Sequence, residues 1–300
     1  MFSLRGSLTG VLLLAAVLPV VSETLWQAKP FSSQGFTTGI EGPACDRAGV
    51  VYCVGFGDPR NIARVTPDGR AERFVALPEG SAGNGIRFDR AGRMYVADYT
   101  GHKVHRIDPV TRERVTVVHE PRMNQTNDLA IATDGTLYAS DPNWKDGTGQ
   151  IWRIDTQGRA HREAEAMGTT NGIEVSPDGR RLYVNESVQR RIWVFDLEAD
   201  GRLGRRRLFK EFPDHGFDGM RCDIDGNLYA TRHGKGTVVK ISPAGEVIRE
   251  IDVLGPNPTN LCFGGDDGCT VVVTEAHAKR LVSFRVDRPG LEWARWKAAR

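Results

Sequence analysis

An internal repeat of about 43 residues constrains this chain more strongly than any other feature of its sequence. Six segments share one pattern, in which an apolar run, a turn ending in glycine and a second apolar run follow one another. The turn glycines are Gly49, Gly92, Gly135, Gly179, Gly226 and Gly268, and successive ones lie 43, 43, 44, 47 and 42 residues apart. A period of this length is typical of one four-stranded sheet in a radial array of sheets.

Each repeat also has room for two further strands. In the second repeat these are residues 103–108 and 114–118, and in the fourth they are residues 191–196 and 203–211. Apolar and polar residues alternate along them, as half-buried strands require, and Asp-Gly pairs suited to hairpin turns recur between them. No long helix is expected, and residues 291–300 are too short and ambiguous to assign.

One such sheet cannot bury both of its faces alone, whereas six in a closed ring can. We therefore predict an all-β fold, a six-bladed β-propeller of four-stranded blades, as a single domain over residues 23–300. The ring needs a closure between its two ends. We expect residues 23–33 to supply the fourth strand of the last blade, which begins near Thr259.

Composition and the first residues limit the partners and the location of the protein. Lys and Arg total 40 against 38 Asp and Glu, and this net charge of +2 gives no reason to expect nucleic-acid binding. Arg5, the apolar run at residues 11–21 and the small side chain of Ser22 predict a signal peptide over residues 1–22. We expect export to a periplasmic or extracellular location without a stable membrane span, and an uncleaved N-terminal anchor is the alternative.

The five cysteines have no spacing typical of a metal site. They are Cys45, Cys53, Cys222, Cys262 and Cys269. Their number is odd, and most of them fall inside expected strands, where small buried thiols are common. We therefore expect mostly free thiols in the core.

Polar residues precede the first strand of every repeat at one register. Five positions before each turn motif stand Glu41, Asn84, Asn127, Asn171 and Asp218, and alignment of Phe263 with Phe88 adds Thr259 in the sixth repeat. Because the innermost strands of a propeller all begin at the same end of its channel, these six side chains should converge there. Each of them could instead form a turn that caps its own strand.

The chemistry of this ring suits a hard cation. Two carboxylates and three amide oxygens favour calcium, with magnesium or manganese as alternatives. Zinc is less favoured because no histidine stands at this register. The loops that follow the second strand of each repeat are candidates for substrate walls, or are solvated tips. They span residues 56–58, 98–99, 141–144, 186–187, 232–233 and 275–277, and the longest continues from 141 to 149.

Several of these segments together resemble a known family. They are FTTGIEGP at 36–43, TND at 126–128, TNGI at 170–173, FDGM at 217–220 and PTNLCFGG at 258–265. In order and spacing, over residues 36–286, they resemble the senescence marker protein (regucalcin), gluconolactonase and luciferin-regenerating enzyme family. The resemblance implies a six-bladed propeller with a divalent cation held by Glu41, Asn171 and Asp218. It implies a further ligand or substrate contact at Asn127, and we expect Asn84 and Thr259 to contact substrate.

Two positions depart from patterns seen among these proteins. A similar propeller, diisopropylfluorophosphatase, has a second calcium site with an Asp where this chain has Arg221, so that second site is not expected here. Sugar-lactone members of the family have an Arg where this chain has Gln125. An Arg there would hold substrate hydroxyls or the ring oxygen, so the resemblance leaves the identity of the lactone open.

The function expected from these residues is metal-dependent hydrolysis of a small lactone or ester, with Asp218 as the catalytic residue. Asp218 could act as general base on water or as a nucleophile, and the sequence does not separate the two. The alternatives are a phosphotriesterase of the fluorophosphatase kind and a propeller that binds a ligand without catalysis. The pairing of Asp218 with Glu41 favours an enzyme, because a binding module has no need of two adjacent charges.

Overall fold

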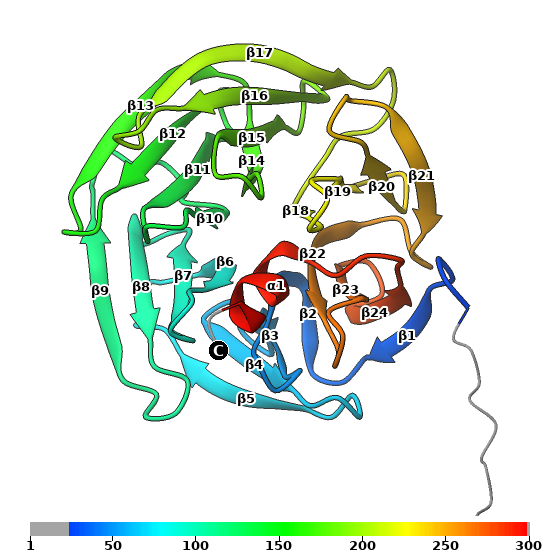
Figure 1. The fold of residues 1–300 in the computed structure, drawn as a ribbon. Coiled ribbons are helices and arrows are strands. Elements are labelled where there is room, and N and C mark those ends of the chain that lie inside the picture. Colours follow the sequence, from blue (N-terminus) through cyan, green and yellow to red (C-terminus); the bar gives the residue numbers. More distant parts are fainter. Residues whose placement is uncertain (1–23, 299–300) are drawn as a thin grey trace, which may run out of the picture.

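The computed structural model describes residues 24–298 as six four-stranded antiparallel sheets arranged around a central channel (Figure 1). The predicted six-bladed β-propeller is therefore confirmed. The predicted signal peptide at residues 1–22 lies outside the described residues and stays a prediction. In the part of the chain that is described, no helix is both long and apolar enough to cross a membrane.

Each blade runs outward from an innermost strand beside the channel. Blade 1 consists of β2 (Phe36–Cys45), β3 (Val51–Phe56), β4 (Asn61–Val65) and β5 (Ala71–Ala76). Blade 2 consists of β6 (Gly83–Phe88), β7 (Met94–Asp98), β8 (Lys103–Ile107) and β9 (Arg114–His119). Blade 3 consists of β10 (Leu129–Ile131), β11 (Leu137–Asn143), β12 (Thr148–Ile154) and β13 (Ala160–Met167).

The remaining blades repeat this order. Blade 4 consists of β14 (Thr170–Val175), β15 (Arg181–Glu186), β16 (Arg191–Leu197) and β17 (Leu203–Glu211). Blade 5 consists of β18 (Met220–Cys222), β19 (Leu228–Arg232), β20 (Thr237–Ile241) and β21 (Val247–Asp252). Blade 6 consists of β22 (Pro258–Gly264), β23 (Thr270–Glu275), β24 (Arg280–Arg285) and the N-terminal β1 (Lys29–Ser32).

The ring closes through β1, as the sequence predicted. This strand pairs antiparallel with β24 in the register Lys29 to Ser283 and Pro30 to Val282. A strand from one end of the chain thereby completes the blade formed by the other end, so no blade edge is left open between blade 6 and blade 1.

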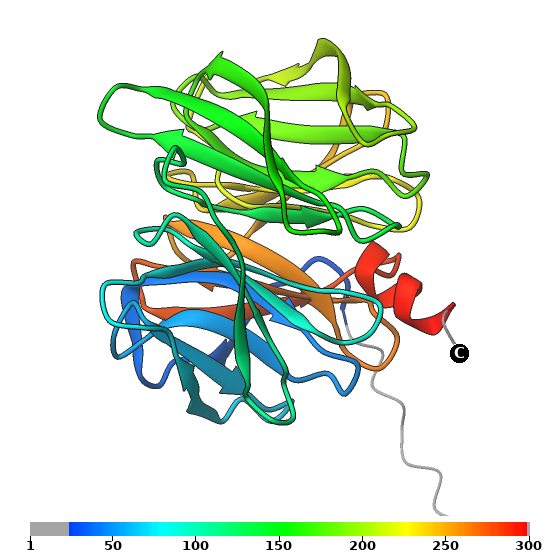
Figure 2. The ribbon, with the colours of Figure 1, turned by 90° about the vertical axis from the view of Figure 1, so that its left-hand side faces the viewer.

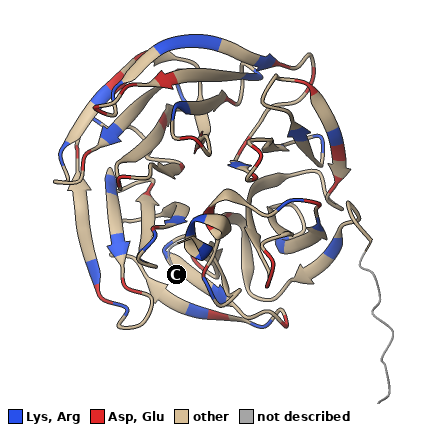
Figure 3. Ribbon diagram, viewed as in Figure 1, with Lys and Arg blue, Asp and Glu red and all other residues tan. Residues whose placement is uncertain are grey.

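The hydrophobic core lies between the faces of neighbouring blades. Tyr52 of blade 1 packs edge to face on Phe74 of its own blade at 5.0 Å between ring centroids and on Phe88 of blade 2 at 5.5 Å. All five cysteines are free, and four of them are buried in these layers, which confirms the expected core thiols. Lys and Arg positions and Asp and Glu positions are both spread along the ribbon around the ring (Figure 3).

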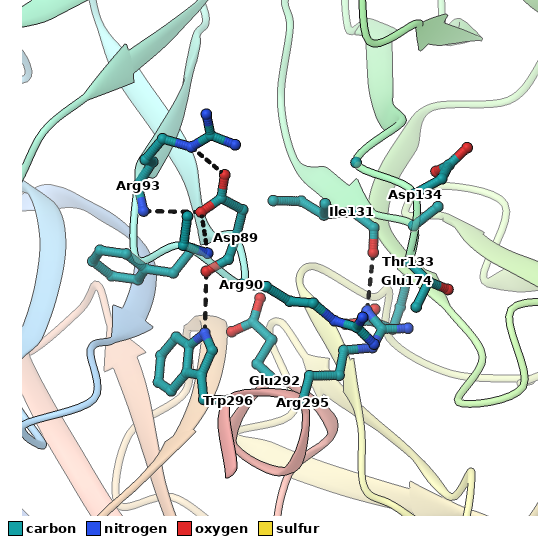
Figure 4. Close-up of a pocket in the computed structure, with 14 residues that line it drawn as sticks. Asp89, Arg90, Arg93, Ile131, Thr133, Asp134, Glu174, Glu292, Arg295 and Trp296 are labelled. Carbon is teal, nitrogen blue, oxygen red and sulfur yellow. Dashed lines mark hydrogen bonds and ion pairs between the residues drawn. The ribbon is translucent and has the colours of Figure 1, made fainter. Parts of the chain in front are cut away.

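A short C-terminal helix, α1 (Leu291–Lys297), covers one end of the channel (Figures 1 and 2). The buried Trp296 packs on Phe88 and donates from its indole N–H to the Asp89 carbonyl at 3.2 Å. Arg295 donates to the Ile131 carbonyl at 3.0 Å, so the helix joins blades 2 and 3 (Figure 4). The ambiguous end of the sequence is thus a plug, and the predicted polar ring is at the opposite ends of the innermost strands.

A buried carboxyl group, Glu174, stands on β14 beside this plug (Figure 4). Burial raises the pKa of Glu174 from its ordinary value near 4.5 to about 7. The positive charges of Arg87 on β6 and Arg295 on α1 oppose this rise, and the carboxylate of Glu292 on α1 adds to it. The folded protein therefore holds this proton more tightly than the unfolded chain does.

This shift predicts a pH-dependent gain in stability for Glu174→Gln. A raised folded-state pKa contributes stability below pH 4.5 that is lost as the pH rises through about 7. Glutamine imitates the protonated acid, so the variant and the wild type should have the same free energy of unfolding at pH 5. At pH 8 the free energy of unfolding of the variant, measured by urea denaturation, should be higher by up to about 3 kcal/mol. Exposed Glu113→Gln is the control. Equal differences at the two pH values would contradict the assignment.

Candidate metal-binding site at the open end of the channel

All six residues of the predicted ring line one pocket of about 470 Å³ at the end of the channel opposite α1. They are Glu41, Asn84, Asn127, Asn171, Asp218 and Thr259. Each comes from a different blade, and five of them stand at or just before the start of an innermost strand, whereas Glu41 lies midway along the longer β2. The common register in the sequence has therefore become a common location in space.

Direct hydrogen bonds between blades hold this ring together. In three places the residue that follows a ring residue donates its backbone N–H to the backbone carbonyl of the ring residue in the next blade. Gly85 donates to Asn127 at 2.8 Å, Gly172 to Asp218 at 3.0 Å and Gly219 to Thr259 at 2.7 Å. A Cβ at Gly172 would overlap the Asp218 carbonyl oxygen, so glycine permits the close approach of blades 4 and 5.

The three ring asparagines aim acceptor oxygens at the pocket without protein partners. The Oδ1 atoms of Asn84, Asn127 and Asn171 are buried and accept no hydrogen bond in the described part of the chain. The orientation of Asn171 is set on its other side, where Nδ2 donates to Ser187 Oγ at 3.1 Å. Unpaired buried acceptors are costly, and a bound cation is one partner that would satisfy all three.

Glu41 and Asp218 are half-buried, and their carboxyl groups interact with each other at the pocket. Enclosure by the blades raises the pKa of Glu41 to about 7, and a hydrogen bond from Gly42 N–H lowers it in part. Enclosure and the neighbouring Glu41 charge raise the pKa of Asp218 well above its usual range. Two enclosed carboxyl groups in contact cannot both ionise at little cost unless a cation neutralises them.

The donor set therefore fits a hard cation. Among the residues described, no three His, Cys, Asp or Glu side chains are grouped as a metal site. The ring instead offers two carboxyl groups and three amide oxygens, which is the oxygen chemistry that calcium and magnesium take. The sixth position is different, because the Thr259 hydroxyl donates to the Ile40 carbonyl at 2.9 Å and holds β2 in place.

A buried ionic cluster beneath the ring was not foreseen. Asp128 is fully buried and lies 3.1 Å from Arg87 and 3.1 Å from Arg221, which are buried as well. Asn260 also contacts Asp128, at 3.4 Å, and hydrogen bonds toward Glu41. The sequence did contain a sign of this cluster, because Arg87 and Arg221 are charged residues inside apolar strands and each stands three residues after a ring position.

The loops predicted as substrate walls contain residues that line the pocket and buried acidic residues that hold neighbouring segments in place. Tyr99, Trp144, Ser187 and His233 line the pocket. The acidic residues beside them are buried anchors for the segments that lead into the ring. Each accepts a hydrogen bond from a backbone N–H: Asp98 from Ala82, Asp141 from Asn124 and Gln125, Glu186 from Gly168, and Glu275 from Asn257.

Two expectations about these loops need correction. Residues 56–58 and 275–277 are not among those that line the pocket. Residues 141–149 are not one long loop, because β11 and β12 continue through them and pair Asp141 with Gln150 and Asn143 with Thr148. The extended ladder satisfies the backbone groups that a free loop would leave to water.

A comparison with known protein families gives a match over most of the propeller. The family model described as the SMP-30/gluconolactonase/LRE-like region matches residues 39–277. The chain belongs to this family. It is 30% identical over 255 residues to a gluconolactonase of Zymomonas mobilis, covering 73% of this chain and 71% of that protein.

Other relatives match over a smaller share or at lower identity. A 6-deoxy-6-sulfogluconolactonase of Pseudomonas putida is 31% identical over 158 residues, about half of each protein, 52% of this chain and 53% of the relative. A solved structure called a calcium-binding protein, regucalcin, from Agrobacterium tumefaciens has a TM-score of 0.74 at 22% identity. It covers 87% of this chain and 96% of its own, and it shows the shared fold.

The hydrogen-bonded ring predicts a specific defect for Gly172→Ala. The added methyl group must displace the Asp218 backbone, because it meets the Asp218 carbonyl oxygen. We expect calcium affinity, measured by calorimetry, to fall at least tenfold. Gly92→Ala is the control for loss of a glycine, because a Cβ there meets no atom within 4 Å, although its φ of +81° favours glycine. Equal calcium affinity in the Gly172 variant and the wild type would contradict this role of the glycine.

Proposed function

We propose that this protein is a divalent-metal-dependent lactonase, with calcium as the preferred cation. The observation that carries the proposal is the contact between the Glu41 and Asp218 carboxyl groups inside a ring of unpaired amide oxygens. The pocket above them, of about 470 Å³, has room for a small cyclic ester. Membership of a family that includes gluconolactonases supports the same reaction class.

Glu41, Asn171 and Asp218 would hold the cation, with Asn127 and Asn84 beside them as further oxygen donors or substrate contacts. When bound, such an ion supplies a Lewis acid that polarises an ester carbonyl and stabilises the oxyanion. The chain contributes the position of each oxygen. Asn171 is fixed by Ser187, and the Asp218 backbone is fixed by Gly172 and by Asn185, whose Nδ2 donates to its carbonyl at 2.6 Å.

Asp218 is the catalytic residue in this proposal. Its carboxylate removes a proton from water as the water oxygen bonds to the lactone carbonyl carbon. The ring C–O bond then breaks, the proton passes to the departing alkoxide oxygen, and a hydroxy acid leaves. In the alternative course the Asp218 oxygen itself attacks the carbonyl carbon and the ring C–O bond breaks. Water then attacks the Asp218 carbonyl carbon of the resulting anhydride, one of its protons passes to the alkoxide oxygen, and the hydroxy acid leaves. A single turnover in ¹⁸O-labelled water distinguishes them, because only the second course leaves label in Asp218.

Asp218→Asn should lose both calcium binding and lactone hydrolysis. The amide removes one negative charge from the ring and cannot accept the proton of water. We expect kcat/KM to fall at least 1,000-fold and the calcium Kd, measured by calorimetry, to rise at least tenfold. Exposed Asp266→Asn is the matched control.

Two results would overturn the proposal. One is hydrolysis by Asp218→Asn at the wild-type rate. The other is full activity of the wild-type protein after exhaustive chelation, followed by no response to added calcium, magnesium or manganese.

A further inference from the structure

The pocket above the polar ring has an apolar wall, formed by Tyr99, Trp144 and Val188. Trp144 is 37% exposed and Val188 is 63% exposed, although both are large hydrophobic residues at a pocket. They come from blades 3 and 4, and Tyr99 comes from blade 2. Exposed apolar side chains gathered at a cavity mark a surface that a ligand can cover.

This wall is held in place by hydrogen bonds. Trp144 stands at the tip of the extended β11–β12 hairpin, where Asn143 and Asp146 bond to each other. The Trp144 backbone N–H donates to Gln125 Oε1 at 3.3 Å, and the Gln125 N–H donates to the buried Asp141 at 2.6 Å. The indole is therefore presented by a fixed scaffold, as a substrate-binding wall requires.

The same pocket lacks a positive side chain. Among the residues that line it, none is Lys or Arg. Arg232 directly precedes His233 of the pocket in the sequence, but its side chain is fully buried, lies 2.8 Å from Asp214 and stacks on Phe212. Burial lowers the pKa of His233 below its usual range, so this pocket residue is neutral at pH 7. Apart from the cation proposed for the ring, an anionic substrate finds no positive partner among the side chains that line the pocket.

Two of the hydroxyl groups that line the pocket already donate to backbone carbonyls and are not free donors for a substrate. Ser187 Oγ already donates to the Phe217 carbonyl at 2.7 Å, and the Thr259 hydroxyl already donates to Ile40. A sugar lactone carries several hydroxyl groups, and each one buried without a partner reduces affinity. An alkyl or aryl substituent gains from the same wall by burying apolar surface.

We propose that the preferred substrate is a neutral lactone with an apolar alkyl or aryl substituent, which packs on Tyr99, Trp144 and Val188. This inference rests on the proposed lactonase function and adds the substrate class. A polyhydroxylated lactone is a poorer substrate, and a phosphorylated or sulfonated lactone is poorer still.

The test compares three six-membered lactones with the calcium-loaded protein. They are δ-nonalactone, which has an alkyl chain, glucono-δ-lactone, which has hydroxyl groups, and 6-phosphoglucono-δ-lactone, which is an anion. We expect kcat/KM for δ-nonalactone to exceed that for glucono-δ-lactone at least tenfold. Equal or higher kcat/KM for either sugar lactone would overturn the substrate class while leaving the lactonase function standing. No hydrolysis of any lactone would overturn the lactonase function itself.

Two substitutions link the preference to the wall. Trp144→Ala should lower the ratio of kcat/KM for δ-nonalactone to that for unsubstituted δ-valerolactone about tenfold, mainly through KM. Val188→Lys places a cation at the rim and should raise kcat/KM for the phosphorylated lactone relative to δ-nonalactone. Val110→Ala, which removes an apolar side chain that is 88% exposed and away from the pocket, is the control. Unchanged ratios in both wall variants would contradict the assignment.

Discussion

Two carboxyl groups from blades 1 and 5 are held against each other at the open end of the channel, and the site depends on this enclosure. Glu41 and Asp218 are far apart in the chain, so their contact exists only when the whole ring is closed. The pairing of β1 with β24 provides that closure. A defect at the outer edge of blade 6 would therefore disturb the site at the centre, although no residue of β1 touches it.

The close approach of the blades has its own requirements. Where strand ends meet around the ring, backbone groups leave the ladder and bond to the neighbouring blade, and Gly172 and Gly219 make room for this. One layer outward, buried acids such as Asp141 and Glu275 accept the amides of the segments that enter the ring. Each of these two acids accepts several hydrogen bonds, so these anchors fix the segments that lead into the ring before any ligand arrives.

The sequence predicted features that repeat with the blade, and it missed those that join different blades. The turn glycines gave the six blades, and the constant offset from them gave the residues of the pocket, because register is conserved from one blade to the next. The spacing singles out Arg87 and Arg221, but it does not reveal that they share Asp128 of a third blade as their partner. The α1 plug escaped detection because seven residues carry too little periodicity, and its stability comes from packing on Phe88.

The buried cluster bears on how many cations this channel can hold. Arg221 stands where a related propeller has an Asp of a second calcium site, and here its guanidinium lies 3.1 Å from Asp128. Arg87 contacts the same carboxylate, so two fixed positive charges flank Asp128 beneath the ring. A second metal ion beside Asp128 would meet two buried cations and a carboxylate that both of them already engage. Removing Asp128 would leave Arg221 buried without its carboxylate, whereas Arg87 would keep Glu292 of α1 at 3.7 Å, so the arrangement resists loss of its acid chiefly through Arg221. The two arginine side chains thus supply positive charge next to Asp128, which is consistent with the proposal of a single cation in the ring above.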